Sequence, residues 1–267
     1  MTLLFLSQTA VAKKTQFYLQ DQLDGELMAK VYVIGETDQQ QQVQKSLYTA
    51  VDHARRFLKT IDRKDPQSEI SRLNQMNVKG VFPISPELAR GVETGIEISK
   101  KSNGMFDVTS ASNTPLYKKV SLKNGELKLG SEGIVLTLDN ITEGLLADLI
   151  ADDLNNAGWS DALVKVGGAY VSRGSDSQGP WNIPIVVPGS TRAKRVIYYK
   201  AKDGASGATW KKSVTVFAPT GAKALGYANA LHRMGIEEAK KFIAGHKELR
   251  AVFIDSQGNV THIPKFR

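Results

Sequence analysis

Four short motifs contain the residue types that could hold a ligand or carry out chemistry. They are residues 68–74 (SEISRLN), 104–109 (GMFDVT), 138–144 (LDNITEG) and 164–174 (VKVGGAYVSRG). The second places one carboxylate, that of Asp107, between apolar neighbours, and the third runs into a predicted helix whose first N–H groups favour a phosphate. In the fourth, Gly167 and Gly168 allow a ligand or another backbone to approach closely. Each motif alone is a common structural pattern. Only their order and spacing together indicate a site that holds a ligand.

The predicted helices and strands place these motifs at their ends. Residues 39–61 carry apolar side chains at helical spacing, and residues 28–34 alternate like a strand. Further helices are predicted at 85–98, 143–157, 223–234 and 237–244, and further strands at 163–166, 183–187, 196–199, 214–217, 251–254 and 260–263. The order lacks the strict alternation of a doubly wound sheet. The sequence therefore predicts an α+β fold of mixed sheets with packed helices.

The N-terminus predicts export. Residues 1–12 are apolar, end in the small-residue pattern AVA and precede Lys13 and Lys14, as a secretory signal peptide does. The alternative is a buried N-terminal strand. The chain has no cysteine, which agrees with an oxidising compartment and excludes thiolate metal sites, cysteine nucleophiles and a lipidated cysteine anchor. We expect a periplasmic protein with one domain over residues 13–267 and, because no apolar run reaches about 18 residues, no membrane span.

The charge balance indicates a basic surface rather than a nucleic-acid site. The formal net charge is +8 over 267 residues, which would suit nucleic acid, an anionic membrane or a phosphate-bearing ligand. However, the lysines and arginines are scattered, and no aromatic residues are interleaved with them as stacking platforms. We therefore expect no nucleic-acid partner.

Taken together and in this order, the motifs resemble the ApbE family of exported FAD:protein FMN transferases. The resemblance extends from about Met28 to the C-terminus and is strongest over residues 68–174. The positions that match family motifs are Met28-Ala29 (a Met-Gly-Thr start), 68–74, 104–109, 138–144, 166–168 (V-x-x-G-G) and 205–207 (a T-S-G turn). The resemblance implies an ApbE-like layered α/β fold with T-fold-like mixed sheets.

The resemblance also implies a ligand and a reaction. Such proteins bind FAD and a divalent metal, usually Mg²⁺, cleave the pyrophosphate and attach FMN to a Thr or Ser of a target flavoprotein. Flavin nucleotide, and a periplasmic flavoprotein or redox partner, are therefore the expected partners. The residues that it implies for cofactor binding are Met28, Phe106, Asp107, Thr137, Glu143, Gly144, Gly167, Gly168 and Ser206.

The chain departs from the family pattern at the metal positions. Leu225 lies where the family has a metal-binding Asp, and Asn229 lies where it has a Thr. Thr137 replaces an Asp that touches the flavin nucleotide, and Asn140 falls near the remaining metal position. A hard cation requires oxygen ligands, which leucine lacks. We expect a metal site at Asn140 and Asn229 that is weak or lost.

A catalytic loop is also missing. The family's H-x-x-D-P-x-T-G loop has no counterpart between residues 207 and 214, and Lys64 occupies the position of a ring-stacking aromatic. None of the histidines replaces that loop by position: they are His53, His232, His246 and His262. No catalytic residue is predicted.

Three hypotheses follow. The chain is a flavin-binding or accessory member of the family with weakened or lost catalysis, and this is the hypothesis we favour. Alternatively, it is an active Mg²⁺-dependent transferase with a metal site rearranged around Asn140, Asn229 and either Asp139 or Asp203. As a third option, it is a non-enzymatic periplasmic scaffold that kept the fold and lost the ligand.

Overall fold

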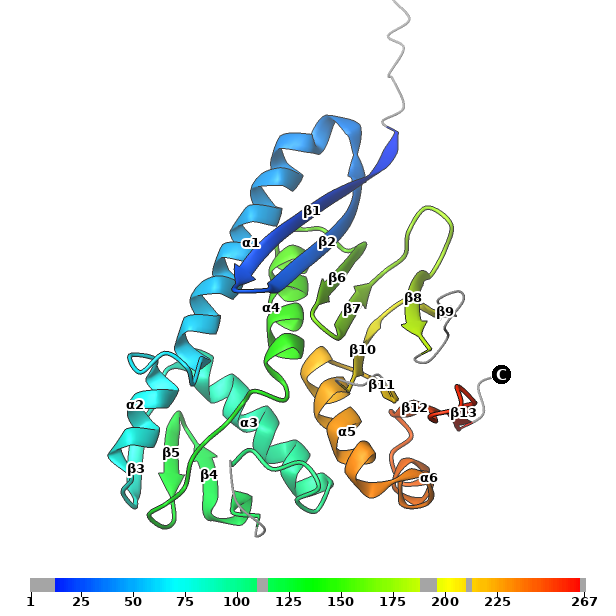
Figure 1. Ribbon diagram of the computed structural model, residues 1–267. Coiled ribbons are helices and arrows are strands. Elements are labelled where there is room, and N and C mark those ends of the chain that lie inside the picture. Colours follow the sequence, from blue (N-terminus) through cyan, green and yellow to red (C-terminus); the bar gives the residue numbers. More distant parts are fainter. Residues whose placement is uncertain (1–12, 110–114, 188–195, 210–212, 265–267) are drawn as a thin grey trace, which may run out of the picture.

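The computed structural model describes residues 13–109, 115–187, 196–209 and 213–264 (Figure 1). The helices are α1 (Gln40–Ile61), α2 (Glu69–Met76), α3 (Pro86–Lys101), α4 (Thr142–Asn156), α5 (Gly221–Met234) and α6 (Ile236–Ala244), with 3-10 turns at Thr37–Gln39 and Tyr117–Lys119. The strands are β1 (Lys14–Asp24), β2 (Leu27–Glu36), β3 (Gly80–Pro83), β4 (Val120–Lys123), β5 (Glu126–Leu129), β6 (Ala162–Val166), β7 (Ala169–Arg173), β8 (Trp181–Val186), β9 (Val196–Ala201), β10 (Gly204–Ala208), β11 (Val214–Ala218), β12 (Arg250–Ile254) and β13 (Val260–Ile263).

The main sheet has eight strands in the order β1-β2-β6-β7-β10-β11-β12-β13. Neighbouring strands in this sheet are antiparallel. Successive side chains of a strand point to opposite faces. In β2, Val31 and Val33 enter the main hydrophobic core, whereas Tyr32 and Ile34 belong to a separate cluster on the other face. The two faces of the sheet are therefore covered by different elements.

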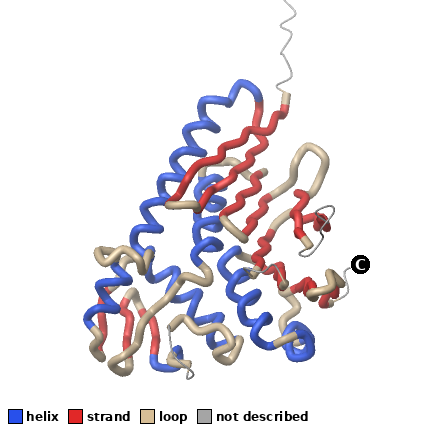
Figure 2. Tube along the Cα trace, in the orientation of Figure 1, coloured by secondary structure: helices blue, strands red, loops and turns tan. Residues whose placement is uncertain are grey.

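Three helices cover one face of the main sheet (Figures 1 and 2). α1 packs on β1 and β2, α4 on β6 and β7, and α5 on β10 and β11. α1 buries a stripe that includes Val43, Leu47 and Val51 and exposes its polar side, as its helical spacing predicts. α4 lies between α1 and α5 and buries most of its circumference, which explains why its sequence is apolar on nearly all sides.

The β8–β9 hairpin lies over the opposite face of the main sheet. Trp181 and Ile183 pack against Ile34 and Leu163. The Trp181 ring nitrogen donates a hydrogen bond to the Arg173 carbonyl oxygen at 2.9 Å. A second small cluster forms where the hairpin meets β12. The hairpin is thus fixed above the face that carries no helices.

A smaller lobe contains α2, α3 and the three-stranded sheet β3-β5-β4. The motif at residues 68–74 joins this lobe to the segment that precedes α4. Asn74 Oδ1 accepts a hydrogen bond from the Leu136 N–H at 2.8 Å, and its Nδ2 donates to the Leu136 carbonyl at 3.0 Å. Glu69 Oε1 accepts a hydrogen bond from the Ser85 N–H at 2.7 Å, at the start of α3. In this chain the motif connects α2 to the start of α3 and to the segment before α4.

The predicted α+β class is confirmed, and the predicted helices and strands are present with shifts of a few residues at their ends. The predicted strands did not include β1, β3, β7 or β10, and no bounds were predicted for β4 and β5. The expected turn at residues 205–207 was wrong, because these residues lie inside β10 and are paired with β7 on one side and β11 on the other. The signal peptide predicted at residues 1–12 lies outside the described residues. Within the described part of the chain, no helix combines the length and apolarity needed to span a bilayer.

Candidate functional site

The paired glycines form the turn between β6 and β7, and the first turn of α4 faces it. Glu143 Oε2 accepts a hydrogen bond from the Gly168 N–H at 2.6 Å. Gly167 has a φ of +51°, and a Cβ at this position would lie 2.1 Å from Glu143 Cδ. Only glycine combines this backbone conformation with so close an approach. Glu143, Gly167 and Gly168 are therefore one structural unit.

Behind this unit, α4 contacts the N-terminus of α5. A Cβ on Gly144 would lie 2.3 Å from the Gly221 carbonyl carbon, so the two backbones touch. Asp148, only 4% exposed, accepts hydrogen bonds from the N–H groups of Gly221 at 2.6 Å and Ala222 at 3.0 Å. Burial raises the pKa of Asp148 to about 6, against the lowering effect of these two bonds. Gly144 thus allows the close contact between α4 and the start of α5.

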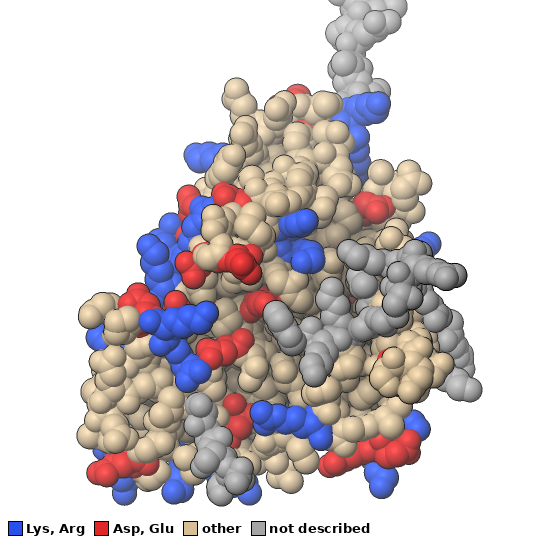
Figure 3. Space-filling model, viewed as in Figure 1, with Lys and Arg blue, Asp and Glu red and all other residues tan. Residues whose placement is uncertain are grey.

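A cleft of about 790 Å³ opens beside Glu143 and Gly167. Met28 lines it from the start of β2, and the end of α1 forms another wall. Lysines and carboxylates are mixed in its lining: they are Lys30, Lys64, Lys165, Asp24, Glu26, Asp62, Asp139 and Glu143. Charges of both signs are also interspersed over the face of the molecule that Figure 3 shows. The volume suits a small-molecule ligand, and the walls offer both donors and acceptors.

A smaller pocket of about 90 Å³ continues from this cleft and shares Lys165 and Gly167 with it. Gly168, Tyr170 and Ser206 line the smaller pocket, and Ser206 is only 3% exposed. Lys165 Nζ donates a hydrogen bond to the Gly167 carbonyl at 2.6 Å and lies 5.5 Å from the centre of the Tyr170 ring. Five of the predicted site residues thus line two pockets that share Lys165 and Gly167: they are Met28, Glu143, Gly167, Gly168 and Ser206.

Three other predicted site residues lie around a separate loop: Phe106 and Asp107 belong to it, and Thr137 is bonded to it. Both carboxylate oxygens of Asp107 are used there: Oδ1 accepts from the N–H and hydroxyl of Thr109 at 2.8 and 2.9 Å, and Oδ2 accepts from the Leu116 N–H at 2.9 Å. Phe106 is 3% exposed and belongs to the main core. The Thr137 N–H bonds to the same loop. In this structure Phe106 and Asp107 shape their own loop.

The two asparagines predicted at the metal position do meet. Asn229 Nδ2 donates hydrogen bonds to the carbonyl oxygens of Asn140 at 3.3 Å and Leu225 at 3.0 Å. Leu225 is 5% exposed, and its backbone packs against Gly207 of β10. The position predicted to correspond to the family's metal-binding Asp is therefore occupied by a buried apolar side chain.

The carboxylates that could replace the missing ligand have other partners. Arg63 donates to both oxygens of Asp139 at 2.6 to 3.2 Å, and this pairing raises the pKa of Arg63. Asp203 accepts a hydrogen bond from the Gly174 N–H at 2.9 Å and lines a different groove. No group of three or more His, Cys, Asp or Glu residues in the described ranges could hold a metal ion. At the predicted metal position itself, Leu225 offers no side-chain oxygen and the Asn229 amide nitrogen faces carbonyl oxygens, so this position does not fit Mg²⁺.

Each histidine has a hydrogen-bond partner away from the cleft. The ring Nδ1 pairs are His53 with Asp153 at 2.7 Å, His232 with Ser213 at 3.2 Å, His246 with the Phe242 carbonyl at 2.8 Å, and His262 with Tyr199 at 3.0 Å. No histidine lines the cleft along the described segments. The missing histidine loop falls partly on residues 210–212, which lie outside the described residues.

Two cleft residues, Lys165 and Tyr170, were not selected from the sequence. Both lie within the motif at residues 164–174, where Val164, Val166 and Val171 are buried in the main core. The alternation of a strand places Lys165 and Tyr170 on the other face. That alternation was the signal that could have identified them.

Comparisons with known proteins agree on one relationship. The model of the ApbE family matches residues 28–118 and 110–209. A protein of Salmonella typhimurium called FAD:protein FMN transferase is 24% identical over 87% of this chain and 83% of its own. The Escherichia coli K12 protein of the same name is 24% identical over 76% of this chain and 74% of its own.

Solved structures show the same fold. The flavin transferase ApbE from Vibrio cholerae superimposes with a TM-score of 0.76 at 17% identity, over 94% of this chain and 97% of that one. The apo form of the flavinyl transferase ApbE from Pseudomonas stutzeri gives a TM-score of 0.75 at 18% identity, over 95% of each chain. The layered arrangement of sheets and helices is shared across nearly the whole length.

Proposed function

Because this chain belongs to the ApbE family, we propose that it binds a flavin nucleotide in the cleft beside Glu143 and has lost the FMN-transfer reaction. The proposal depends on one contrast. The unit of Glu143, Gly167 and Gly168 keeps a close-fitting geometry at the edge of a cleft of about 790 Å³. The positions expected to hold the metal carry Leu225 and an asparagine whose amide nitrogen bonds to carbonyl oxygens.

The cleft residues support binding without a resident cation. Lys30, Lys64 and Lys165 line it and can place positive charge near phosphates. Met28 adds an apolar wall, and Ser206 offers a hydroxyl in the adjoining pocket. FAD is the ligand to test first, since the relatives are called FAD:protein FMN transferases. Transfer of FMN in this family would need Mg²⁺, for which Leu225 offers no side-chain oxygen ligand.

In this proposal the protein acts outside the cytoplasm. The apolar N-terminal residues followed by Lys13 and Lys14 support export to the periplasm. There the protein holds flavin or assists the maturation of a flavoprotein. Cell fractionation, together with the N-terminal sequence of the purified protein, tests this part. Recovery in the cytoplasm with residues 1–12 intact would contradict it.

The first experiment is a titration of the full chain with FAD, with and without EDTA, followed by flavin fluorescence and thermal unfolding. FAD at 100 times its dissociation constant should stabilise the protein by about 2.7 kcal/mol. Binding should be the same in EDTA. Lys64→Glu, an exposed change in the cleft, should weaken FAD binding, whereas Lys59→Glu on the exposed side of α1 is the matched control.

A transfer assay separates this proposal from its alternatives. The protein is incubated with FAD, Mg²⁺ and a flavoprotein that carries an acceptor threonine, and covalent FMN is measured by in-gel fluorescence. We expect none. EDTA-sensitive labelling would establish an active transferase instead, and a complete absence of FAD binding would leave the non-enzymatic scaffold.

A further inference from the structure

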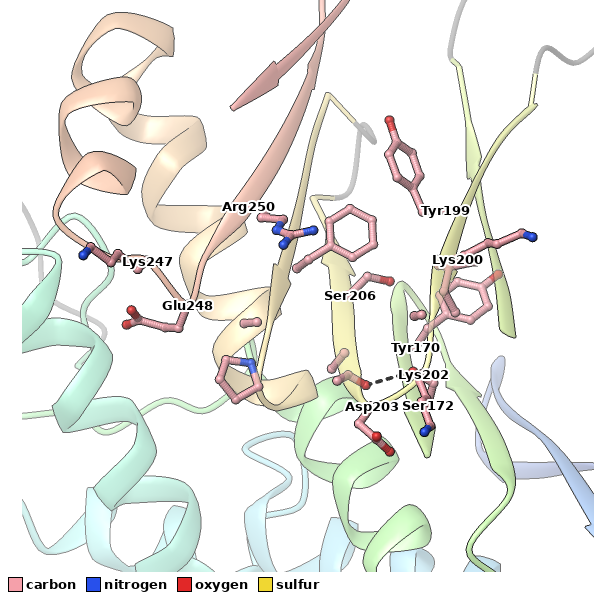
Figure 4. A pocket seen from close by; sticks show the side chains of 17 residues that line it. Tyr170, Ser172, Tyr199, Lys200, Lys202, Asp203, Ser206, Lys247, Glu248 and Arg250 are labelled. Atoms are coloured by element: carbon pink, nitrogen blue, oxygen red, sulfur yellow. Dashed lines mark hydrogen bonds between the residues drawn. The ribbon is translucent and has the colours of Figure 1, made fainter. Parts of the chain in front are cut away.

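A groove runs along β1, and none of its described lining residues belongs to the candidate site. The groove drawn in Figure 4 lies elsewhere, because it shares Tyr170 and Ser206 with the small pocket of that site. The β1 groove has a volume of about 190 Å³, and residues 17–19 form one of its walls. The facing wall comes from the first half of α1: it contains Gln40, Gln44, Leu47 and Tyr48. An opening is thus present between β1 and α1 at one edge of the main sheet.

The outer edge of β1 has no strand beside it within the described ranges. β1 is an end strand of the eight-stranded order, and β2 pairs with its inner edge (Figure 1). Many proteins keep such edges short or place charges along them, because unpaired N–H and C=O groups can pair with another chain. β1 is 11 residues long, and Tyr18 near its middle is 49% exposed. The edge is therefore able to add a further strand.

Opposite charges lie towards the two ends of this edge. Lys13 directly precedes β1, and its carbonyl oxygen accepts the Thr37 N–H at 3.2 Å, so the ladder with β2 includes Lys13. Asp21 lies towards the other end, where Arg55 forms ion pairs with both Asp21 and Asp52. Two carboxylates beside one guanidinium leave a surplus negative charge. A strand that runs antiparallel to β1 and has the same sequence would place a lysine at each acidic end.

The faces of the sheet restrict which register this self-pairing can take. Residues directly opposite each other in antiparallel strands point to the same face. Lys13 and Asp21 lie on one face, because they are eight positions apart and the ladder with β2 is regular between them. Lys14 and Asp24 lie on opposite faces, since the register with β2 shifts between Gln22 and Asp24. A lysine therefore meets an aspartate on the same face only in the register centred on Phe17.

We propose that two copies of this chain pair through β1 in the antiparallel register centred on Phe17 and form a dimer with one continuous sheet. The two-fold axis gives two contacts between Lys13 of one copy and Asp21 of the other. Phe17 meets Phe17 of the second copy on the face that carries α1, beside the groove. Both α1 helices lie on this face, so Tyr48, which is 45% exposed, is brought towards the axis.

The size of this contact predicts a dimer that depends on concentration. The paired edge over residues 13–21 is about 31 Å long. With a sheet and a helix layer about 20 Å deep in all, the contact covers about 600 Å² on each copy, at the lower end of specific interfaces. The inference goes beyond the proposed function, because the dimer forms without a ligand and uses no residue of the Glu143 cleft.

The test measures the mass of the purified protein by analytical ultracentrifugation over a range of concentrations, without flavin. We expect the mass to rise to twice that of one chain. Lys13→Glu and Asp21→Lys each set like charges against each other, and each should weaken the dimer at least tenfold. An equimolar mixture of the two variants should dimerise again, since every contact between unlike chains restores an opposite pair. Because Lys13 and Asp21 lie about 27 Å apart along one strand, this recovery cannot come from a contact within one chain.

Lys123→Glu, an exposed change on β4 of the smaller lobe, is the matched control and should leave the dimer unchanged. The mass of a single chain at every concentration would overturn the inference and leave the edge to a strand of another protein. A dimer that neither reversal weakens would also overturn it, as would a mixture of folded variants that stays monomeric.

Introduced cysteines test the register, because the chain has none of its own. Phe17→Cys should form a disulfide-linked dimer on oxidation, since residue 17 lies opposite itself in the proposed pairing. Thr15→Cys lies opposite Leu19 and should not link to itself. Linkage through Thr15→Cys, with none through Phe17→Cys, would overturn the proposed register.

Discussion

Lowering the pH from 7 to 5 is expected to stabilise this protein through one buried carboxylate, that of Asp148. Its pKa is raised to about 6 from 3.8, chiefly by burial, while Arg90 lowers it and Asp152 raises it to smaller extents. Because the folded-state pKa lies above the unfolded value, the folded protein binds the proton first. The contribution of Asp148 to the free energy of unfolding is therefore fully present below pH 4 and is lost as the pH rises through 6.

The size of the Asp148 contribution to stability follows from the shift in its pKa. About two pKa units at about 1.4 kcal/mol per unit give about 3 kcal/mol below pH 4. Between pH 7 and pH 5 only the upper part of this range is crossed, which corresponds to about 1 kcal/mol. Other carboxylates act in the opposite direction: a hydrogen bond from Arg55 holds the pKa of Asp21 below its usual range. The quantity to measure is therefore a difference between two proteins.

The assay is urea unfolding of the unchanged chain and of Asp148→Asn at pH 7, 6 and 5. The free energy of unfolding of the unchanged chain, minus that of the variant, should rise by about 1 kcal/mol as the pH falls from 7 to 5. Asp38→Asn on the surface is the control. A difference that stays constant or shrinks would refute the reasoning. It would mean that the hydrogen bonds from Gly221 and Ala222 outweigh burial and keep the carboxylate ionised.

Three further predictions concern the small lobe, the glycine turn and the metal position. Asn74→Ala should lower the free energy of unfolding by about 2 kcal/mol in urea, because it leaves both backbone groups of Leu136 without their partners. Gly167→Ala should cost about 1–3 kcal/mol, and the loss should shrink when Glu143→Ala removes the clashing carboxylate, as a double-mutant cycle would detect. Leu225→Asp places a carboxylate at a buried position, so thermal unfolding should move up with added Mg²⁺ in this variant and not in the unchanged chain.

Much of the fold could be predicted because it depends on local patterns. α1 follows from the helical spacing of Val43, Leu47 and Val51, and α3 follows from Ser85 followed by Pro86, since the Ser85 hydroxyl accepts the Leu88 N–H at 3.2 Å. These signals lie within a few residues of the structure that they specify.

β10 could not be predicted, because its sequence reflects a long-range contact. Its residues, GASGA, lack the β-branched and aromatic side chains typical of a strand. The strand instead leaves space for a helix: a Cβ on Gly207 would lie 2.5 Å from the Leu225 backbone nitrogen. The small residues that were predicted to form a turn instead allow β10 and α5 to pack closely.

The candidate site likewise contains features that could be predicted from the sequence and features that could not. Glu143 and the two glycines could be selected from the sequence, because each lies in a recognisable motif. The ion pair between Arg63 and Asp139 joins residues 76 positions apart, and no local pattern in either segment predicts it. Asp107 was selected from its motif, and in the structure its carboxylate accepts hydrogen bonds from its own loop.

The alternation of β10 explains how metal chemistry could be lost while a binding surface remains. Gly207 faces α5 and the backbone of Leu225, the residue predicted to lie at the family's metal-ligand position. Ser206, one residue earlier, is paired with Tyr170 and Phe217 on the opposite face. Because successive residues of a strand project to opposite faces, a substitution at Leu225 does not need to disturb the small pocket that Ser206 lines. Leu225→Asp should therefore leave the affinity for FAD in EDTA unchanged, and a tenfold loss of that affinity would show that the two faces are coupled through β10.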